Sequence, residues 1–177
     1  MKKSLLPLIF LLIVNCGSSK TEKPIKIKTF ENKNLSVNYP SNWVRFGRTG
    51  AALFIPKTIQ KNTHENEIEH VDVNRITLSI DIKEGIEEIL KHYANSTREN
   101  VKLKNFRLIK LESNPKFIYK IESLRVYNSK PGTYKREEYF YVKDGKLEFN
   151  LYQMREDLFD FYHDDAMLII NSVQHKK

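Results

Sequence analysis

Apolar and polar residues alternate with a period of two along several short stretches of the chain. Leu35, Val37 and Tyr39 alternate with polar residues, and similar spacing recurs in later segments. Such a period places every second side chain on one face, which is typical of a half-buried β-strand. We therefore expect strands at residues 25–30, 35–39, 51–55, 75–82, 107–112, 117–126, 134–142 and 146–154.

Two further stretches have apolar residues at helical spacing. One covers residues 86–98 and the other residues 157–173. In the second, we expect a buried stripe formed by Phe159, Tyr162, Ala166, Ile169 and Val173, widened by Leu158, Phe161, Leu168 and Ile170. This helix is expected to pack on the sheet.

The connections between these segments are of two kinds. Asp144-Gly145 lies between two alternating runs and predicts a tight β-hairpin. Residues 57–74 are polar and rich in Asn, His and Glu, and they predict a long loop. Trp43, the single tryptophan, is expected to seed the core. Together the segments predict an α+β fold, an antiparallel sheet flanked by helices.

The N-terminal sequence changes this picture from a free domain to an anchored one. Lys2 and Lys3 precede a short apolar run that ends near Val14, which is typical of a signal peptide and too short for a membrane span. Ile13-Val14-Asn15-Cys16 resembles a bacterial lipobox, in which the cysteine is diacylated. We therefore expect a signal peptide at 1–15, a lipidated tether at 16–24 and one domain at 25–177.

This interpretation implies a location in the bacterial cell envelope, with the membrane bound through the lipid on Cys16. By resemblance to known sorting signals, Gly17 in place of Asp favours the outer membrane. The precursor has a net charge of +8, and loss of Lys2 and Lys3 leaves +6. A nucleic-acid partner is not expected for an exported protein, and the sequence gives no oligomeric state.

Basic residues are concentrated between residues 101 and 136, whereas acidic ones gather in 57–74 and at the start of the last helix. The candidate binding surface comprises Lys116, Lys120, Arg125, Lys135 and Arg136. If the three strands of this region are neighbours, one face or edge of the sheet is basic. It either binds a partner or protects a sheet edge from aggregation.

Metal and catalytic chemistry have weaker sequence support. A metal or hydrolytic site is conceivable at His64, Glu69, His70 and Asp72, but their spacing matches no known ligand pattern. A second group, His163, Asp164 and Asp165, points to different sides of a helix. We expect solvated charge in both places, with no metal, no cofactor and no catalytic residues.

Three segments resemble one known family. They are 35–43, around Tyr39-Pro40 and Trp43; 139–146, the late hairpin; and 159–173, the closing helix with its Ile169-Ile170 pair. They resemble the PsbP/Mog/DcrB superfamily. The resemblance implies an antiparallel sheet flanked by helices, an α/β/α sandwich, and a role in binding other proteins. It carries over no catalytic residue.

The function expected from these observations is that of a lipid-anchored, non-enzymatic accessory module that binds an envelope protein. One alternative is a small-ligand or lipid carrier with an apolar pocket between sheet and helix. The other is a metal-dependent or hydrolytic enzyme that uses the 64–72 segment.

Overall fold

The computed structural model describes residues 25–46, 52–60, 69–78, 85–97, 101–127 and 131–176. The expected signal peptide, Cys16 and the tether lie outside these residues, as do His64, Ile80 and Ile82. Among the described residues, no helix is long and apolar enough to span a membrane.

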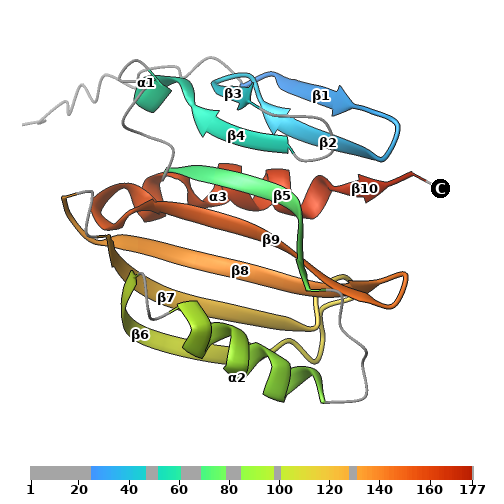
Figure 1. The fold of residues 1–177 in the computed structure, drawn as a ribbon. Coiled ribbons are helices and arrows are strands. Elements are labelled where there is room, and N and C mark those ends of the chain that lie inside the picture. Colours follow the sequence, from blue (N-terminus) through green and yellow to red (C-terminus); the bar gives the residue numbers. More distant parts are fainter. Residues whose placement is uncertain are drawn as a thin grey trace, which may run out of the picture.

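The described strands form two antiparallel sheets (Figure 1). The larger has the order β3-β4-β5-β9-β8-β7-β6. Its strands are β3 (Trp43–Phe46), β4 (Ala52–Pro56), β5 (His70–Leu78), β6 (Val101–Lys110), β7 (Tyr119–Tyr127), β8 (Tyr134–Lys143) and β9 (Lys146–Arg155). The smaller sheet has the order β1-β2-β10, with strands β1 (Ile27–Glu31), β2 (Leu35–Pro40) and β10 (Gln174–His175). The expected antiparallel α+β fold is confirmed.

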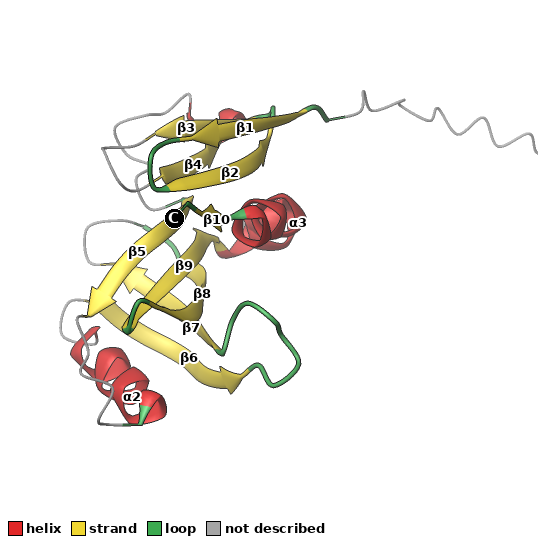
Figure 2. Cartoon of the chain, turned by 90° about the vertical axis from the view of Figure 1, so that its right-hand side faces the viewer, coloured by secondary structure: helices red, strands yellow, loops and turns green. Residues whose placement is uncertain are grey.

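Three helices lie in the described part of the chain. They are α1 (Lys57–Gln60), α2 (Ile86–Thr97) and α3 (Glu156–Ser172). Figure 2 shows α2 and α3 on opposite sides of the β6–β9 strands, with the β1–β4 strands as a further layer beyond α3. The helices predicted at 86–98 and 157–173 are therefore confirmed to within a residue or two.

The alternation along β8 explains why both faces of the sheet are covered. Tyr139 and Tyr141 enter the core on the α3 side, whereas Phe140 enters the core on the α2 side. Trp43 is fully buried on the α3 side and donates its indole N–H to Asp165 of α3 at 2.9 Å. Burial of one such large side chain stabilises the fold by about 1.5–3 kcal/mol.

The predicted Asp144-Gly145 hairpin is confirmed by the pairing of β8 with β9. Asp144 and Gly145 have φ of 49° and 71°, as a type I′ turn requires. Lys143 and Lys146 pair directly on either side of the turn. This register fixes which side chains of β9 face each helix.

The 57–74 segment differs from the expected loop in its described parts. Residues 57–60 form α1, and β5 already begins at His70. Val71 and Val73 are fully buried and pair with β4, so the segment carries an alternating pattern that its polar composition conceals. The short strand β3 was not expected either.

Two expectations about exposure are wrong. Phe161 and Leu168 do not widen the buried stripe of α3, because their side chains are 79% and 37% exposed. The stripe itself is confirmed, since all five of its expected members are buried.

The strand expected at 107–112 begins earlier, at Val101, and has an irregular register around Asn105.

Candidate functional site: the charged cleft beside helix α3

The structure brings the predicted basic region onto three adjacent strands, β6, β7 and β8. Register pairs Arg107 with Glu122 and Leu124 with Lys135 across this part of the sheet. Alternate residues of each strand face opposite helices. The basic side chains are therefore divided between two environments and form no continuous basic face.

On the α2 side, the carboxylate of Glu138 binds the guanidinium groups of Arg125 and Arg136. Glu138 is fully buried, and its two carboxylate oxygens accept hydrogen bonds from Arg125 at 3.2 Å and from Arg136. The hydroxyl of Tyr93, from α2, donates to the same carboxylate at 2.7 Å. Burial opposes ionisation of Glu138, but Arg136 and Arg125 outweigh it and lower the pKa of this carboxyl.

Arg125 and Arg136 therefore do not contribute to an exposed surface. They are 4% and 7% exposed, respectively. A buried guanidinium is tolerated only with a paired charge and hydrogen-bonding partners. For these two residues the expected surface role is replaced by an internal one, because Glu138 lies between them.

On the α3 side, a second carboxylate joins the sheet to the helix. The hydroxyl of Tyr139 donates to Glu137 at 2.6 Å, and His163 Nε2 of α3 lies 3.2 Å from the same oxygen. Lys120 lies 3.8 Å from Glu137 and 2.5 Å from Glu122. Burial raises the pKa of Tyr139, so the hydroxyl remains a donor. The side chains of Glu137, Tyr139, His163, Lys120 and Glu122 are thus hydrogen-bonded or ion-paired with one another.

A cleft of about 570 Å³ opens beside this cluster, between β6, β7, β8 and the start of α3. Its lining comprises Asn105, Phe106, Arg107, Glu122, Ser123, Leu124, Lys135 and Glu156. The lining thus combines partly buried apolar side chains with charges of both signs. Burial opposes ionisation of Glu122, but Lys120 and Arg107 lower the pKa of this carboxyl.

The cations at the cleft differ in how far they reach solvent. The Arg107 side chain is 70% exposed although it pairs with Glu122. The Lys135 side chain is 35% exposed, lies 3.4 Å from Asp160 and covers the ring of Phe159 at 4.2 Å. The Lys135–Asp160 pair is long and exposed, so a carboxylate of a partner can replace Asp160 at little cost in free energy.

Lys116 has a structural role in this fold. Its ammonium donates hydrogen bonds to the carbonyls of Ile170, Asn171 and Val173 at 3.0, 3.1 and 2.8 Å, at the C-terminal end of α3. Those carbonyls lack partners within the helix, and the helix dipole favours a cation there. Burial lowers the pKa of Lys116 to about 8, which leaves it protonated at neutral pH.

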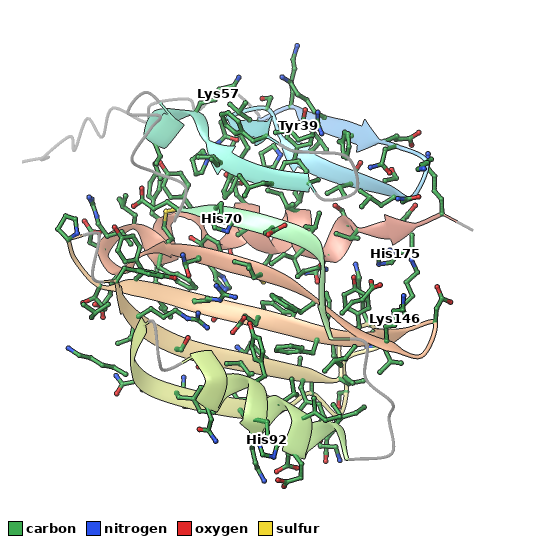
Figure 3. The ribbon with its side chains drawn as sticks, viewed as in Figure 1. Tyr39, Lys57, His70, His92, Lys146 and His175 are labelled. Atoms are coloured by element: carbon green, nitrogen blue, oxygen red, sulfur yellow. The ribbon has the colours of Figure 1, made fainter. Side chains whose placement is uncertain are left out.

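The first group of residues considered for a metal site, at positions 64–72, does not form such a site in the described part of the chain. Glu69 and His70 are buried, Asp72 is half-buried, and His64 lies outside the described residues. Figure 3 shows His70, His92 and His175 on three separate elements. Within the described ranges, no group of three metal-ligating side chains occurs.

The second candidate group is also divided. Asp165 accepts from Trp43 and from Asn42, whereas His163 contacts Glu137. Asp164 is exposed on the outer side of α3. These three residues serve packing and solvation at separate places.

The sequence analysis did not identify the two glutamates that organise this region. Glu137 and Glu138 directly follow Lys135 and Arg136, so four consecutive charged residues lie inside a strand bounded by aromatic residues. Such a run in a two-sided, buried strand indicates internal ion pairs, because isolated charges are too costly to bury. That signal was available from the sequence.

The fold and the charged sheet define an α+β protein with an antiparallel sheet, one helix on each side and a cleft at one end. The chain belongs to the family described as PsbP-like protein, whose sequence profile matches residues 14–173. The expected family resemblance is thereby confirmed. A comparison with curated protein sequences found no match.

Two solved structures have a similar course of the chain. Cyanobacterial PsbP (CyanoP) from Synechocystis sp. PCC 6803 is 13% identical, with 91% of this chain and 99% of that chain covered and a TM-score of 0.49. LpqN, described as involved in cell envelope biogenesis of Mycobacterium tuberculosis, is 12% identical, with 88% and 93% covered and a TM-score of 0.44.

Proposed function

We propose that this protein is held on the cell envelope by a lipid on Cys16 and acts as a non-enzymatic binding module. Its cleft on β6, β7 and β8 receives a segment of an envelope protein. The lipobox-like sequence before Cys16 supports the anchor, and Gly17 favours the outer membrane. Two or more acyl chains are needed for stable anchoring.

The single observation that carries the binding role is the composition of the cleft. Leu124 offers partly buried apolar surface, and Arg107 and Lys135 lie at the solvent side of the cleft. Phe106 also lines the cleft but packs against the core on the α2 side. A volume of about 570 Å³ is within the usual range for binding sites. Apolar surface combined with exchangeable charges suits a protein segment, because the apolar part supplies affinity and the charges fix the register.

Binding is favoured over catalysis because the ionisable side chains beside the cleft already form hydrogen bonds and ion pairs with one another. Glu137 accepts from Tyr139 and contacts His163, and Glu122 is held by Lys120 and Arg107. A general base or nucleophile must instead be positioned against a substrate. The carrier alternative is less favoured because the space between α3 and the sheet is filled by buried rings such as Tyr152 and Phe159, whose centroids are 4.4 Å apart.

The test is a charge reversal at the cleft, Arg107→Glu with Lys135→Glu, in the full-length protein. We expect the yield of a partner crosslinked through Lys104, which pairs with Leu124 of the cleft and is kept in every variant, to fall about tenfold or more, which corresponds to about 1.4 kcal/mol of binding free energy. The matched control, Lys110→Glu with Lys146→Glu, changes net charge equally at exposed positions outside the cleft. Equal yields from both double variants would contradict the role of the cleft.

A further inference from the structure

Exposed apolar side chains gather at the end of the molecule where the described chain begins. Ile25, Ile27 and Phe46 are 52%, 51% and 38% exposed. Ile25 precedes β1, Ile27 is the first residue of β1, and Phe46 is the last residue of β3. The other large exposed apolar residues of the described ranges are scattered over β8 and α3, namely Val142, Phe161 and Leu168.

The strands β1 and β3 belong to one outer layer, which comprises residues 25–46 and 52–60 and is called the β1–β3 layer. Figures 1 and 2 both show them together, beyond α3 and far from β6. The guanidinium of Arg45 in β3 lies over the ring of Phe30 in β1, 4.2 Å from its centroid. Among the described strands β1 pairs with β2 alone, so it is also an edge strand of the smaller sheet.

This layer is strongly basic. Its described residues, 25–46 and 52–60, contain five cations and one carboxylate, a net charge of 5 − 1 = +4. The cations are Lys26, Lys28, Lys33, Arg45 and Lys57. The carboxylate, Glu31, is paired with Lys176 at 3.2 Å. In contrast, the outer side of α3 carries Asp157, Asp160 and Asp164 around its exposed Phe161.

The layer is also the part of the domain tied most closely to the proposed anchor. Ile25 follows Cys16 by nine residues, 25 − 16 = 9. Nine residues extend to at most about 32 Å. A lipid on Cys16 therefore keeps β1 within reach of the membrane surface.

We propose that the β1–β3 layer rests on anionic lipid headgroups, with Ile25, Ile27 and Phe46 entering the interface and Lys26, Lys28 and Arg45 contacting phosphates. This inference rests on the proposed lipid anchor. Along the edge strand β1 the apolar and basic side chains alternate and extend to opposite sides, so an interface that meets the strand edge-on reaches both, and binds by burial and by electrostatic attraction together. A lipid surface is the occupant that matches both the charge and the tether.

This orientation accounts for the position of the cleft. The strands β3 and β6 are the two ends of the seven-stranded sheet, six intervals apart. At about 4.8 Å per interval, the separation is at most about 29 Å along the sheet. With the β1–β3 layer on the membrane, the cleft is presented to partners at the far end of the domain.

The experiment uses the full-length lipoprotein, with acylation of Cys16 verified by mass, reconstituted in vesicles with brominated acyl chains. One variant carries Ile27→Trp and the matched control Val142→Trp, an exposed apolar position beside the β8–β9 turn. The native Trp43 is fully buried and provides the same background in both. We expect bromine to quench the emission of the Ile27→Trp variant and to leave the Val142→Trp variant unchanged.

A second comparison tests the charges. Phosphatidylglycerol vesicles should quench the Ile27→Trp variant more than phosphatidylcholine vesicles, and Lys26→Glu with Lys28→Glu should abolish that difference. An acylated protein that stays on the vesicles with equal quenching of both tryptophan variants overturns the orientation and leaves the anchor intact. A chain that is not acylated at Cys16 overturns both proposals.

Discussion

Glu138 is the residue whose replacement should cost the most stability among the charged groups of the sheet. It is fully buried and binds Arg125, Arg136 and Tyr93. The change Glu138→Gln leaves two guanidinium groups without a compensating charge, so we expect the free energy of unfolding to fall by about 3–5 kcal/mol. Denaturant titration measures this quantity.

The control for this prediction is Glu112→Gln. The Glu112 side chain is 76% exposed and pairs loosely with Lys110 at 3.4 Å. Its replacement should change the free energy of unfolding by less than about 0.5 kcal/mol. Similar losses for both variants would show that Glu138 does not neutralise the buried arginines.

The same carboxylate predicts how stability depends on pH. The pKa of Glu138 is lower in the folded protein than its ordinary value of 4.5, despite burial, because of Arg136 and Arg125. Its stabilising contribution is therefore complete above pH 4.5 and is lost as the pH falls through the folded pKa. The stability difference between wild type and Glu138→Gln should shrink below pH 4.5, and a difference independent of pH would contradict this.

Lys116 gives a second prediction at this scale. The change Lys116→Met leaves the carbonyls of Ile170, Asn171 and Val173 without this donor but also removes the cost of burying the ammonium, so we expect a net loss of about 1 kcal/mol in the free energy of unfolding. The control Lys110→Met, whose side chain is 63% exposed, should be nearly neutral. Thermal or denaturant unfolding of both variants tests the cap, and an equally small effect of Lys116→Met would exclude it.

The helical periodicity of α3 predicts which of its side chains are buried and therefore which of them stabilise the fold. Phe159 is 1% exposed and packs on Tyr152, whereas Phe161, two residues later, is 79% exposed. We expect Phe159→Ala to lower the free energy of unfolding by about 3–5 kcal/mol. Phe161→Ala should change it by less than about 0.5 kcal/mol. Comparable effects would mean that α3 is rotated from the described position.

The elements that were correctly predicted have strong local signals. The Asp144-Gly145 turn requires positive φ at both residues, and the five-residue stripe of α3 follows helical spacing. The strand β3 has no such local signal, and the alternation of Val71 and Val73 at the start of β5 is short and lies in a polar segment. These strands are fixed by pairing, β3 with β4, and β5 with β4 and with β9, which is distant in sequence.

The candidate site was less predictable than the fold, for a reason that acts at the scale of the whole molecule. Alternation indicates that Lys135 and Arg136 face opposite sides of the sheet, but it does not say that α2 covers one of those sides. Arg136 is consequently buried beside Glu138, whereas Lys135 borders the cleft. The arrangement depends on which helix packs on which face, and that depends on the complete fold.

The whole molecule has its apolar and basic layer at one end of the large sheet and its cleft at the other. In our account the first end contacts the membrane and the second a protein partner. Confinement to a membrane raises the effective concentration of the cleft for a membrane-bound partner. The anchor should therefore be necessary for complex formation as well as for localisation.

The most direct test is crosslinking through lysine side chains in intact cells, followed by mass spectrometry, with wild type beside Cys16→Ser. Our account predicts an envelope protein crosslinked to Lys135 or Lys104, near the cleft, in wild type and lost in Cys16→Ser. Cell fractionation that finds the Cys16→Ser variant exported and free of the membrane is the control that isolates the anchor. The absence of any partner in wild type, or the same partner at equal yield without the anchor, would contradict the account.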